Sequence, residues 1–415
     1  MLAAVKMPEA MDLSRSSLIR LDSTRASTDW NFAAAETASR SLVWPNAHQP
    51  IQLCEQGRPA QQWSNPLEAL RWLEADGQSA MRAEDRWIGY LSYDLGRCFE
   101  SLPRTAADDL GLPLMAFVHC ARATDGAEES RILQEKLIAT ARGDVRSTFT
   151  RDAYLGAVRR AIEYIAAGDV FQVNLSHRFS LPRPASARQI YQRLLSQSPA
   201  AYGALLDFGS FSLVSNSPEL FLRIERDPIS GDRRLITRPI KGTRPRQSGM
   251  DVELLRSAKD QAELNMIVDL ERNDLGRVCR VGSVKVTQPR TIETHPTVFH
   301  GVATVEGILR DDCGFAETIN ALFPGGSITG APKIRAMEII EELEPVRRGP
   351  YCGAIGYLAA DGSAQFNIAI RTMIVKDGQI HIPVGGGIVA DSDPDAEYEE
   401  TLVKARAMFT ALDIA

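Results

Sequence analysis

The chain has 415 residues, 44% of them hydrophobic and 24% charged, which is enough for a buried core and excludes wholesale disorder. Its 47 basic and 53 acidic residues leave a net charge of −6, which argues against general nucleic-acid binding because that function needs a basic face. We expect a cytoplasmic protein without membrane contact, because no apolar run approaches the roughly 18 residues of a membrane span, no signal-peptide pattern opens the chain, and the six cysteines are scattered singly.

The first 145 residues show only short strand-like runs, such as 87–93, in an irregular pattern. A polar stretch over 141–150 separates them from a more regular part, and we place a soft boundary there. The sequence thus predicts an N-terminal region, 1–145, followed by a second region, 146–415.

Hydrophobic residues at three- and four-residue steps predict a helix over 151–168, and the next strand is predicted over 170–176. The two faces of this strand should carry Phe171, Val173 and Leu175 on one side and Gln172, Asn174 and Ser176 on the other. Further strands are expected at 203–207, 211–216, 220–226, 234–240, 353–358, 366–375 and 379–384, and further helices at 187–196, 251–276, 315–322, 332–343 and 395–412. Because the strands come in runs instead of alternating with helices, we expect an α+β fold with mainly antiparallel sheets.

Two acidic pairs could form a metal site. Asp260 and Glu263 lie three residues apart on one expected helix, and Glu397 and Glu400 lie three apart on the last one, so each pair shares a helix face. Two such faces brought together would offer the carboxylate oxygens that Mg²⁺ prefers. A solvated helix face is the more common explanation of this spacing taken alone.

Two basic features could serve catalysis or substrate binding. Lys241 stands among Arg238, Arg244 and Arg246, and like charges or burial would lower its pKa and free the amine as nucleophile or base. Arg371, on an expected strand, could hold a carboxylate with two hydrogen bonds. The alternatives are a basic surface turn and a surface ion pair.

Two glycine-rich segments could approach a ligand closely. The first, 323–333, reads Phe-Pro-Gly-Gly-Ser-Ile-Thr-Gly-Ala-Pro-Lys and precedes a helix, whose free N–H groups favour anions. The second, Gly385-Gly386-Gly387, follows a strand and could present backbone donors to a carboxylate. Either segment could also be only a tight turn.

Taken together, the chain resembles the chorismate-utilising enzymes over about residues 150–415. The motifs that carry the resemblance occur in the family's order: Ser217-Pro218-Glu219, Pro239-Ile240-Lys241-Gly242-Thr243, the helix from Ala262-Glu263 to Arg272-Asn273-Asp274, Ser327 to Lys333, Gly385 to Val389, and Glu397-x-x-Glu400. The family includes anthranilate synthase component I, isochorismate and salicylate synthases, and aminodeoxychorismate synthase component I. The resemblance implies an anthranilate-synthase-component-I-like fold, in which two mainly antiparallel sheets form a sandwich with flanking helices, and a chorismate-binding catalytic region at 146–415 that is intertwined with 1–145.

Within the family the chain is most similar to the aminodeoxychorismate synthases, on the run from Gly89 to Pro103 and on Lys241, where anthranilate synthases typically have alanine. Isochorismate and salicylate synthases carry a base lysine where this chain has Gln172, and a neutral amide cannot activate water as a base. Anthranilate synthase component I remains the nearest alternative. A catalytically inactive paralogue is another, although the motif residues are intact.

The resemblance also implies roles for individual residues. Lys241 would attack C2 of chorismate, Glu219 would protonate the departing C4 hydroxyl, and His300 would lie near the ring. Mg²⁺ would be held by Glu263 and Glu400, with Asp260 and Glu397 in support. Substrate would be bound by the remaining motif residues: Gln172, Thr243, Ser327, Thr329, Tyr351, Arg371, Gly385, Gly386 and Gly387. Ammonia would come from a separate glutamine amidotransferase subunit, because the chain has no Gly-x-Cys-x-Gly nucleophile turn.

Overall fold

A computed structural model describes residues 18–24, 30–122 and 145–414, with side chains throughout those ranges except at 33–39 and 80. Part of the soft boundary expected near residue 145 lies outside the described residues. No helix within the described ranges is long and apolar enough to cross a membrane.

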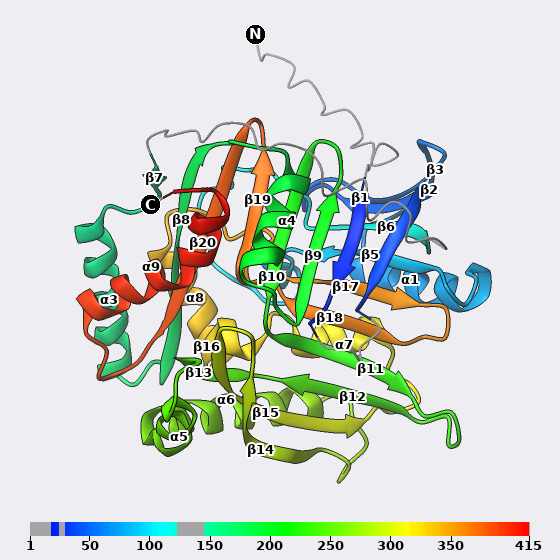
Figure 1. Cartoon of the computed structure of the whole chain (residues 1–415). Helices are drawn as coiled ribbons and strands as arrows, with labels where there is room; N and C mark the ends of the chain where they lie inside the picture. Colours follow the sequence, from blue (N-terminus) through cyan, green and yellow to red (C-terminus); the bar gives the residue numbers. More distant parts are fainter. Residues whose placement is uncertain (1–17, 25–29, 123–144, 415) are drawn as a thin grey trace.

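The first of two antiparallel sheets is assembled from distant parts of the chain (Figure 1). Its strands lie in the order β2 (Phe32–Trp44), β1 (Leu18–Asp22), β9 (Tyr202–Asp207), β10 (Phe211–Ser217), β19 (Thr372–Lys376), β20 (Gln379–Ile388) and β8 (Gln172–Pro182), and the short strands β7 (Arg146–Ser147) and β16 (Gly330–Ala331) both pair with β8. Strands from before and after residue 145 therefore share one sheet.

The second sheet is also antiparallel and also mixes early and late strands. Its order is β14 (Lys285–Thr294), β15 (Val298–Ile308), β12 (Arg233–Arg238) continued by β13 (Ile240–Pro245), β11 (Leu220–Arg226), β18 (Ala364–Ile368), β17 (Ala354–Ala359), β5 (Arg86–Leu91), β6 (Met115–Arg122), β2, β3 (Ile51–Glu55) and β4 (Arg58–Trp63). The long strand β2 belongs to both sheets. The α+β class with mainly antiparallel sheets is confirmed.

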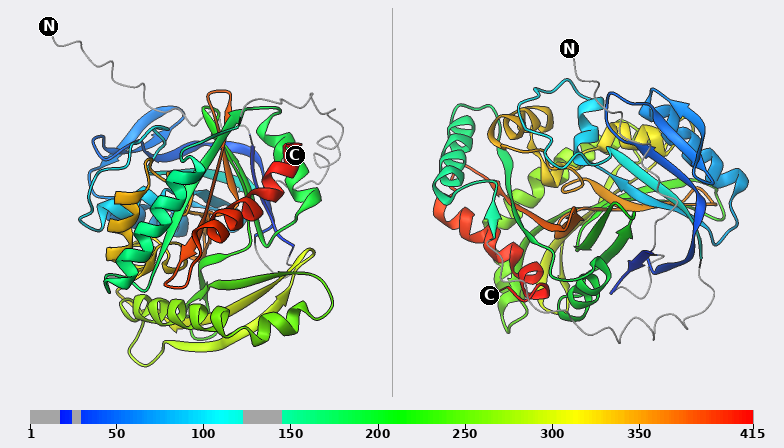
Figure 2. Two further views of the ribbon diagram at one scale, coloured as in Figure 1. Left: turned by 90° about the vertical axis from the view of Figure 1, so that its left-hand side faces the viewer. Right: turned by 90° about the horizontal axis from the view of Figure 1, so that it is seen from above.

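Helices flank the sheets, as Figure 2 shows from two further sides. They are α1 (Pro66–Ala80), α3 (Arg151–Ala166), α4 (Ala187–Gln197), α5 (Met250–Arg256), α6 (Ala258–Gly276), α7 (Phe315–Leu322), α8 (Lys333–Leu343) and α9 (Pro394–Ala411). Helix α9 packs on β20, and α6 packs on β15. Local sequence fixes the helix starts: Thr150 caps α3 through the Ala153 N–H, and Asp393 caps α9 through the Ala396 N–H.

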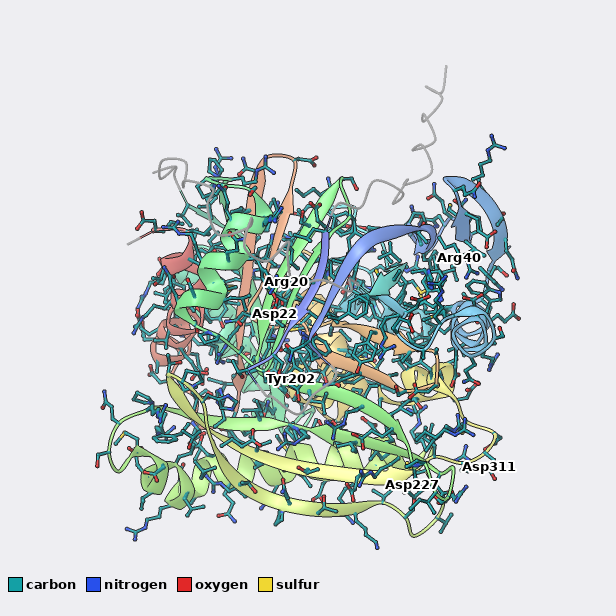
Figure 3. The ribbon with its side chains drawn as sticks, turned by 45° about the vertical axis from the view of Figure 1, so that its right-hand side comes forward. Arg20, Asp22, Arg40, Tyr202, Asp227 and Asp311 are labelled. Atoms are coloured by element: carbon teal, nitrogen blue, oxygen red, sulfur yellow. The ribbon has the colours of Figure 1, made fainter. Side chains whose placement is uncertain are left out.

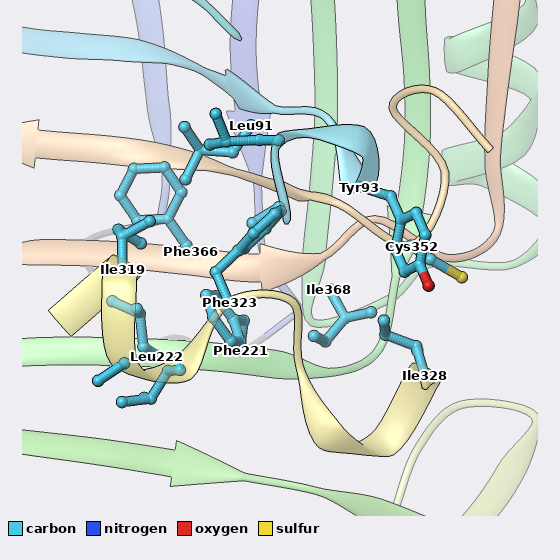
Figure 4. Close-up of a cluster of buried hydrophobic side chains, with 14 of the residues drawn as sticks. Leu91, Tyr93, Phe221, Leu222, Ile319, Phe323, Ile328, Cys352, Phe366 and Ile368 are labelled. Atoms are coloured by element: carbon cyan, nitrogen blue, oxygen red, sulfur yellow. The ribbon is translucent and has the colours of Figure 1, made fainter. Parts of the chain in front are cut away.

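Hydrophobic side chains from both sheets meet in shared clusters. One cluster joins Ile19 and Leu206 of the first sheet to Tyr90 and Ile355 of the second. Another includes Leu91, Phe221, Ile319, Phe323 and Phe366, which come together beside the loop that follows α7 (Figure 4). Burying two sheet faces against one another is what makes the sandwich stable.

The first strand is fixed to the rest of the molecule by polar contacts as well. The Arg20 guanidinium pairs with Asp22 at 2.8 Å, and Asp22 also accepts a 2.7 Å hydrogen bond from the Tyr191 hydroxyl of α4. The Trp30 indole N–H donates to the Gly203 carbonyl at 2.7 Å and packs edge-on against Tyr202 (Figure 3 labels Arg20, Asp22 and Tyr202). These contacts join the N-terminal residues to β9.

Three expected elements differ from the structure. The helix predicted at 251–276 is two helices, because Ser257 leaves the helical conformation and caps α6 through the Asp260 N–H. The strand predicted at 366–375 is β18 and β19, separated by a turn in which Arg371 has φ +50°. Phe171 was expected on the same strand face as Val173 and Leu175. This prediction is wrong, because Phe171 precedes β8 and is 70% exposed.

Candidate active site

The side chain of Lys241 is directed by a β-bulge. Between β13 and β15 the register runs from Ile240 opposite Val302 to Thr243 opposite His300, so one extra residue is inserted at Lys241–Gly242. Such a bulge turns a side chain away from its regular alternation. Gly242 has φ +82°, and a Cβ there would lie 2.8 Å from Asp260 Cγ, so the position requires glycine.

Lys241 is surrounded by carboxylates. Burial lowers the pKa of its amine, with a smaller contribution from Lys404, while Glu263, Glu219 and Glu400 oppose that shift. Of the two causes that the sequence suggested, burial is the main one in the structure, and the neighbouring arginines are not among the groups that shift this pKa most. The Arg238 side chain is bound to Glu293 and Thr304, and the Arg244 side chain to Glu253 and Asp260.

Glu219 lies beside Lys241 at the start of β11. It is 5% exposed, and its backbone carbonyl accepts a 3.0 Å hydrogen bond from the Ile368 N–H. Burial raises the pKa of the Glu219 carboxyl, although hydrogen bonds from Ser327 and the Ile240 N–H and the charges of Lys241 and Arg371 lower it. A carboxyl in this position is suited to giving and taking a proton.

The two predicted acidic pairs come together at the edge of the site, on α6 and α9. Glu400 lies 2.7 Å from the Lys404 ammonium, and Glu263 experiences the charges of Lys241, Asp260 and Glu400. Burial and the charges of Asp260 and Glu400 raise the pKa of Glu263, although Lys241 opposes that shift. Burial also acts to raise the pKa of Glu400, but the charge of Lys404 and its hydrogen bond leave it lowered. A Cβ on Gly386 would lie 3.2 Å from Glu397 Oε2 and 3.8 Å from Glu400 Oε1, so α9 directs both carboxylates to that glycine.

The donor set fits a hard cation such as Mg²⁺, which needs only one or two carboxylates together with water and substrate oxygens. Three of the four acids already have partners, since Asp260 pairs with Arg244 at 3.1 Å, Glu397 accepts a 2.6 Å hydrogen bond from Ser392, and Glu400 pairs with Lys404 at 2.7 Å. The Glu400–Lys404 pair is the most exposed of these contacts, so Glu263 and Glu400 are the better direct ligands. The described residues hold no cluster of three or more His, Cys, Asp or Glu side chains that could hold a metal unaided.

The three predicted glycines lie within β20, paired with β8, so the expectation that they follow the strand is wrong: backbone pairing with β8 continues the strand to Ile388. Gly385 is opposite Ser176 and Gly387 is opposite Asn174. A Cβ on Gly387 would lie 2.7 Å from Gln172 Nε2, so the missing side chain makes room for that amide. The Gln172 side chain is fully buried, and neither of its polar atoms has a hydrogen-bond partner among the described residues. Such a group is costly to bury, which favours a ligand that supplies its partners.

Arg371 presents an unpaired cation to the same site. Its backbone carbonyl accepts a 3.0 Å hydrogen bond from the Asn216 N–H, which holds the turn after β18. Burial lowers the pKa of its guanidinium, and Glu219 opposes the shift. No carboxylate of the described ranges forms an ion pair with this guanidinium, so it is available to an anionic ligand. Tyr351 is buried, and burial raises the pKa of its phenol.

Hydrogen bonds within the loop and from β8 stabilise the segment that carries Ser327 and Thr329. The Thr329 hydroxyl donates to the Gly325 carbonyl at 2.9 Å, so this side chain stabilises the loop. The Asn174 amide donates to the Ser327 carbonyl at 2.8 Å. On the other side of the site, the Thr243 hydroxyl and His300 Nδ1 are 2.9 Å apart.

A buried ion pair that sequence patterns did not single out supports these segments. Arg348 and Glu344 lie 2.6 Å apart, and both are almost fully buried. The Arg348 guanidinium also donates to the carbonyls of Ile328 and Asn174, each at 2.9 Å, and Glu344 accepts from Ser176. The spacing of four residues was the available signal, but such pairs usually lie on exposed helix faces.

We expect Arg348→Met to lower the free energy of unfolding by about 3–5 kcal/mol, because it leaves the Glu344 charge buried without a partner. Urea denaturation of the purified protein measures this. The double variant Arg348→Met/Glu344→Leu should regain part of the loss, since it removes both charges. A single variant within about 1 kcal/mol of the parent, the usual value of an exposed pair, would contradict the assignment.

Comparisons with known proteins identify the family of the chain. The family model described as chorismate binding enzyme matches residues 27–410. The chain belongs to this family. It is 43% identical to anthranilate synthase component 1 of Thermus thermophilus, over 79% of this chain and 77% of that one. It is 41% identical to aminodeoxychorismate synthase component 1 of Escherichia coli, over 79% of this chain and 76% of that one.

A solved structure confirms the predicted fold. Anthranilate synthase component I from Streptococcus pneumoniae superposes with a TM-score of 0.78 at 28% identity, covering 94% of this chain and 92% of that one. The chain is thus an enzyme of chorismate chemistry. Relatives named for two different reactions are about equally similar to it, so overall similarity does not choose between those reactions.

Proposed function

We propose that this enzyme is an aminodeoxychorismate synthase component I, which converts chorismate and ammonia to 4-amino-4-deoxychorismate, a step toward 4-aminobenzoate and folate. The observation that carries the proposal is the amine of Lys241, turned by the bulge into a group of carboxylates, with its pKa lowered by burial. A free amine at this point can act as a nucleophile toward the substrate ring. An alanine there, typical of anthranilate synthases, could not.

In the first half of the reaction, Lys241 Nζ forms a bond to C2 of chorismate. The ring double bonds shift, the C4–oxygen bond breaks, and the proton of Glu219 leaves with the hydroxyl as water. The ammonium formed at Nζ then returns a proton to Glu219. The ring is now bound covalently to Lys241, and the enolpyruvyl group is retained.

In the second half, ammonia attacks C4 and the bond between C2 and Lys241 breaks. Glu219 gives its proton to the departing lysine amine and takes one from the new C4 ammonium, so its protonation state is restored. Arg371, which lacks an ion-pair partner in the described ranges, and Tyr351 would hold one substrate carboxylate. Gln172 would supply hydrogen bonds to the ring.

Glu263 and Glu400 would hold Mg²⁺ at the ring carboxylate, with Asp260 and Glu397 as supporting residues. When bound, the cation would neutralise charge on that carboxylate and stabilise charge developing on the ring. His300, fixed by Thr243, would lie against the ring on the other side of Lys241. Ser327 would keep Glu219 oriented through its hydrogen bond.

Ammonia would reach the enzyme from a glutamine amidotransferase subunit. Several relatives are named component 1, and this chain has no Gly-x-Cys-x-Gly turn. We expect the purified chain to react with chorismate and Mg²⁺ when ammonium salts are supplied but not when glutamine is supplied. Glutamine turnover by the pure chain would contradict this partner.

The identity of the product tests the function itself. Chromatography with mass detection should show 4-amino-4-deoxychorismate, which retains the enolpyruvyl group. Anthranilate, which lacks it, is the product expected of the second candidate, anthranilate synthase component I. That candidate is favoured by the 43% identity to the Thermus thermophilus protein. Anthranilate as the main product would overturn the proposal.

A further inference from the structure

One buried carboxyl near the site has no role in the reaction described above. Glu271 lies in the middle of α6 and is 8% exposed. It accepts a 3.0 Å hydrogen bond from the Thr237 hydroxyl of β12. A carboxylate normally has about four acceptor positions to satisfy, and an unbalanced buried charge is costly. Glu271 is therefore in surroundings that suit a neutral carboxylic acid better than an anion.

Glu271 is connected to the surroundings of Glu219 through Thr237 of β12 and through the loop that carries Ser327. Thr237 lies opposite the irregularity in β11 that follows Leu220, one residue after Glu219. The preceding residue of α6, Leu270, packs against the loop that orients Glu219, since a Cβ on Gly326 would lie 2.6 Å from Leu270 Cδ2. That loop carries Ser327, which hydrogen-bonds to Glu219.

Glu271 and Glu219 have different charged neighbours. Glu271 experiences Glu219 as its strongest charged neighbour, then Asp274 of α6 and Lys333 of α8, and the last two are paired with each other at 2.6 Å. Burial and the Glu219 charge raise the pKa of Glu271 well above its usual value. Glu219 faces the cations Lys241 and Arg371, which favour its ionised form. On Glu271's side, the nearest cation is already neutralised by Asp274.

We propose that Glu219 and Glu271 form a buried carboxyl pair that retains one proton at neutral pH, with Glu271 as a positioning residue that keeps this proton available to Glu219. The proposal rests on the role of Glu219 as general acid in the function proposed above. Two carboxyl groups at one buried site lose their protons in two steps that belong to the pair, because the second ionisation would place like charges together.

The pair accounts for a difficulty at Glu219. Lys241 and Arg371 favour the ionised form of Glu219 and so oppose the burial that raises its pKa, and an ionised Glu219 would lack the proton that the leaving hydroxyl needs. A neighbouring carboxyl in a place without a free cation disfavours that ionisation. Glu271 does not touch the substrate in this scheme, and it acts only through Glu219.

The test compares the pH dependence of kcat in the parent, in Glu271→Gln and in Glu342→Gln. Glu342 is an exposed glutamate on α8 that accepts a 2.7 Å hydrogen bond from Tyr164, and it serves as the matched control. Activity that requires protonated Glu219 declines as pH rises through the pKa of the pair. With Gln at position 271 that decline should begin at lower pH, by about one unit or more, while activity at the acidic end stays near that of the parent.

A second measurement does not depend on the reaction. Infrared difference spectra at neutral pH, parent minus Glu271→Gln, should show one carbonyl band of a protonated carboxylic acid, which Glu342→Gln should not remove. A parent without this band, or a Glu271→Gln profile parallel to that of the parent, would overturn the pair. If the band is present but the enzyme makes no aminodeoxychorismate, the pair stands and the proposed function fails.

Discussion

We expect Lys241→Ala to reduce 4-amino-4-deoxychorismate formation at least about a hundredfold, because the variant has no nucleophile to activate C2. Parent enzyme incubated with chorismate and Mg²⁺ in the absence of ammonia should accumulate protein heavier by chorismate minus water. Peptide mapping should locate this mass on Lys241, and the variant should show none. Intact-protein mass spectrometry and product chromatography measure the two effects.

Two further variants distinguish a covalent role of Lys241 from a purely electrostatic role in substrate binding. Lys241→Arg keeps a positive charge but has no accessible free amine at neutral pH, so it should be as inactive as Lys241→Ala. Lys285→Ala, which removes an exposed lysine of β14, should behave as the parent does. If Lys241→Arg retains most of the rate, Lys241 only binds the substrate, and the covalent scheme is wrong.

Glu263→Gln and Glu400→Gln should each lower activity at least about a hundredfold, because a lost carboxylate weakens both Mg²⁺ binding and the hold on the ring carboxylate. The Mg²⁺ concentration that gives half-maximal rate should rise in both variants. Titration of the rate with Mg²⁺ at saturating chorismate measures the effect, and calorimetry measures cation binding directly.

The matched control is Asp269→Asn, on the same helix as Glu263. Asp269 is exposed and pairs with Arg272 at 2.9 Å, so the substitution changes the charge of α6 without touching the site. It should leave the Mg²⁺ dependence unchanged. Normal Mg²⁺ dependence in Glu263→Gln and Glu400→Gln together would remove these two residues from the proposed metal site.

Much of the fold could be predicted from local pattern. The expected helices near 151–168, 187–196, 315–322, 332–343 and 395–412 all occur within two residues of their predicted ends. Periodicity and capping residues act over a few positions, so these elements need little from the rest of the chain. Strands β14 and β15 were not predicted, because β14 has no buried residue and β15 is buried over a continuous run, so neither shows the alternation of a half-buried strand.

The residues of the site could be named from the sequence, because their motifs are local and resemble one family. The sequence could not predict in which direction each side chain points or which groups surround it. Thr329 was expected to bind substrate and Asp260 to support the metal site, and the structure adds that the Thr329 hydroxyl bonds to its own loop and that Asp260 pairs with Arg244. Their partners lie elsewhere in the chain or in a turn whose shape the tertiary structure sets.

The sequence by itself determined the class of fold, the helices α3, α4, α7, α8 and α9, and the set of chemically competent residues around Lys241, whereas it missed α1 and joined α5 and α6 into one helix. Only the tertiary structure decided which of these groups pair with one another and which shift one another's pKa. It showed that burial, and not the neighbouring arginines, is the main cause of the lowered Lys241 pKa, it joined Arg348 to Glu344, and it brought the charge of Glu219 to bear on Glu271. The physical reason is that burial and Coulomb interactions depend on distances in space, which are fixed only when sheets assembled from both ends of the chain close on one another.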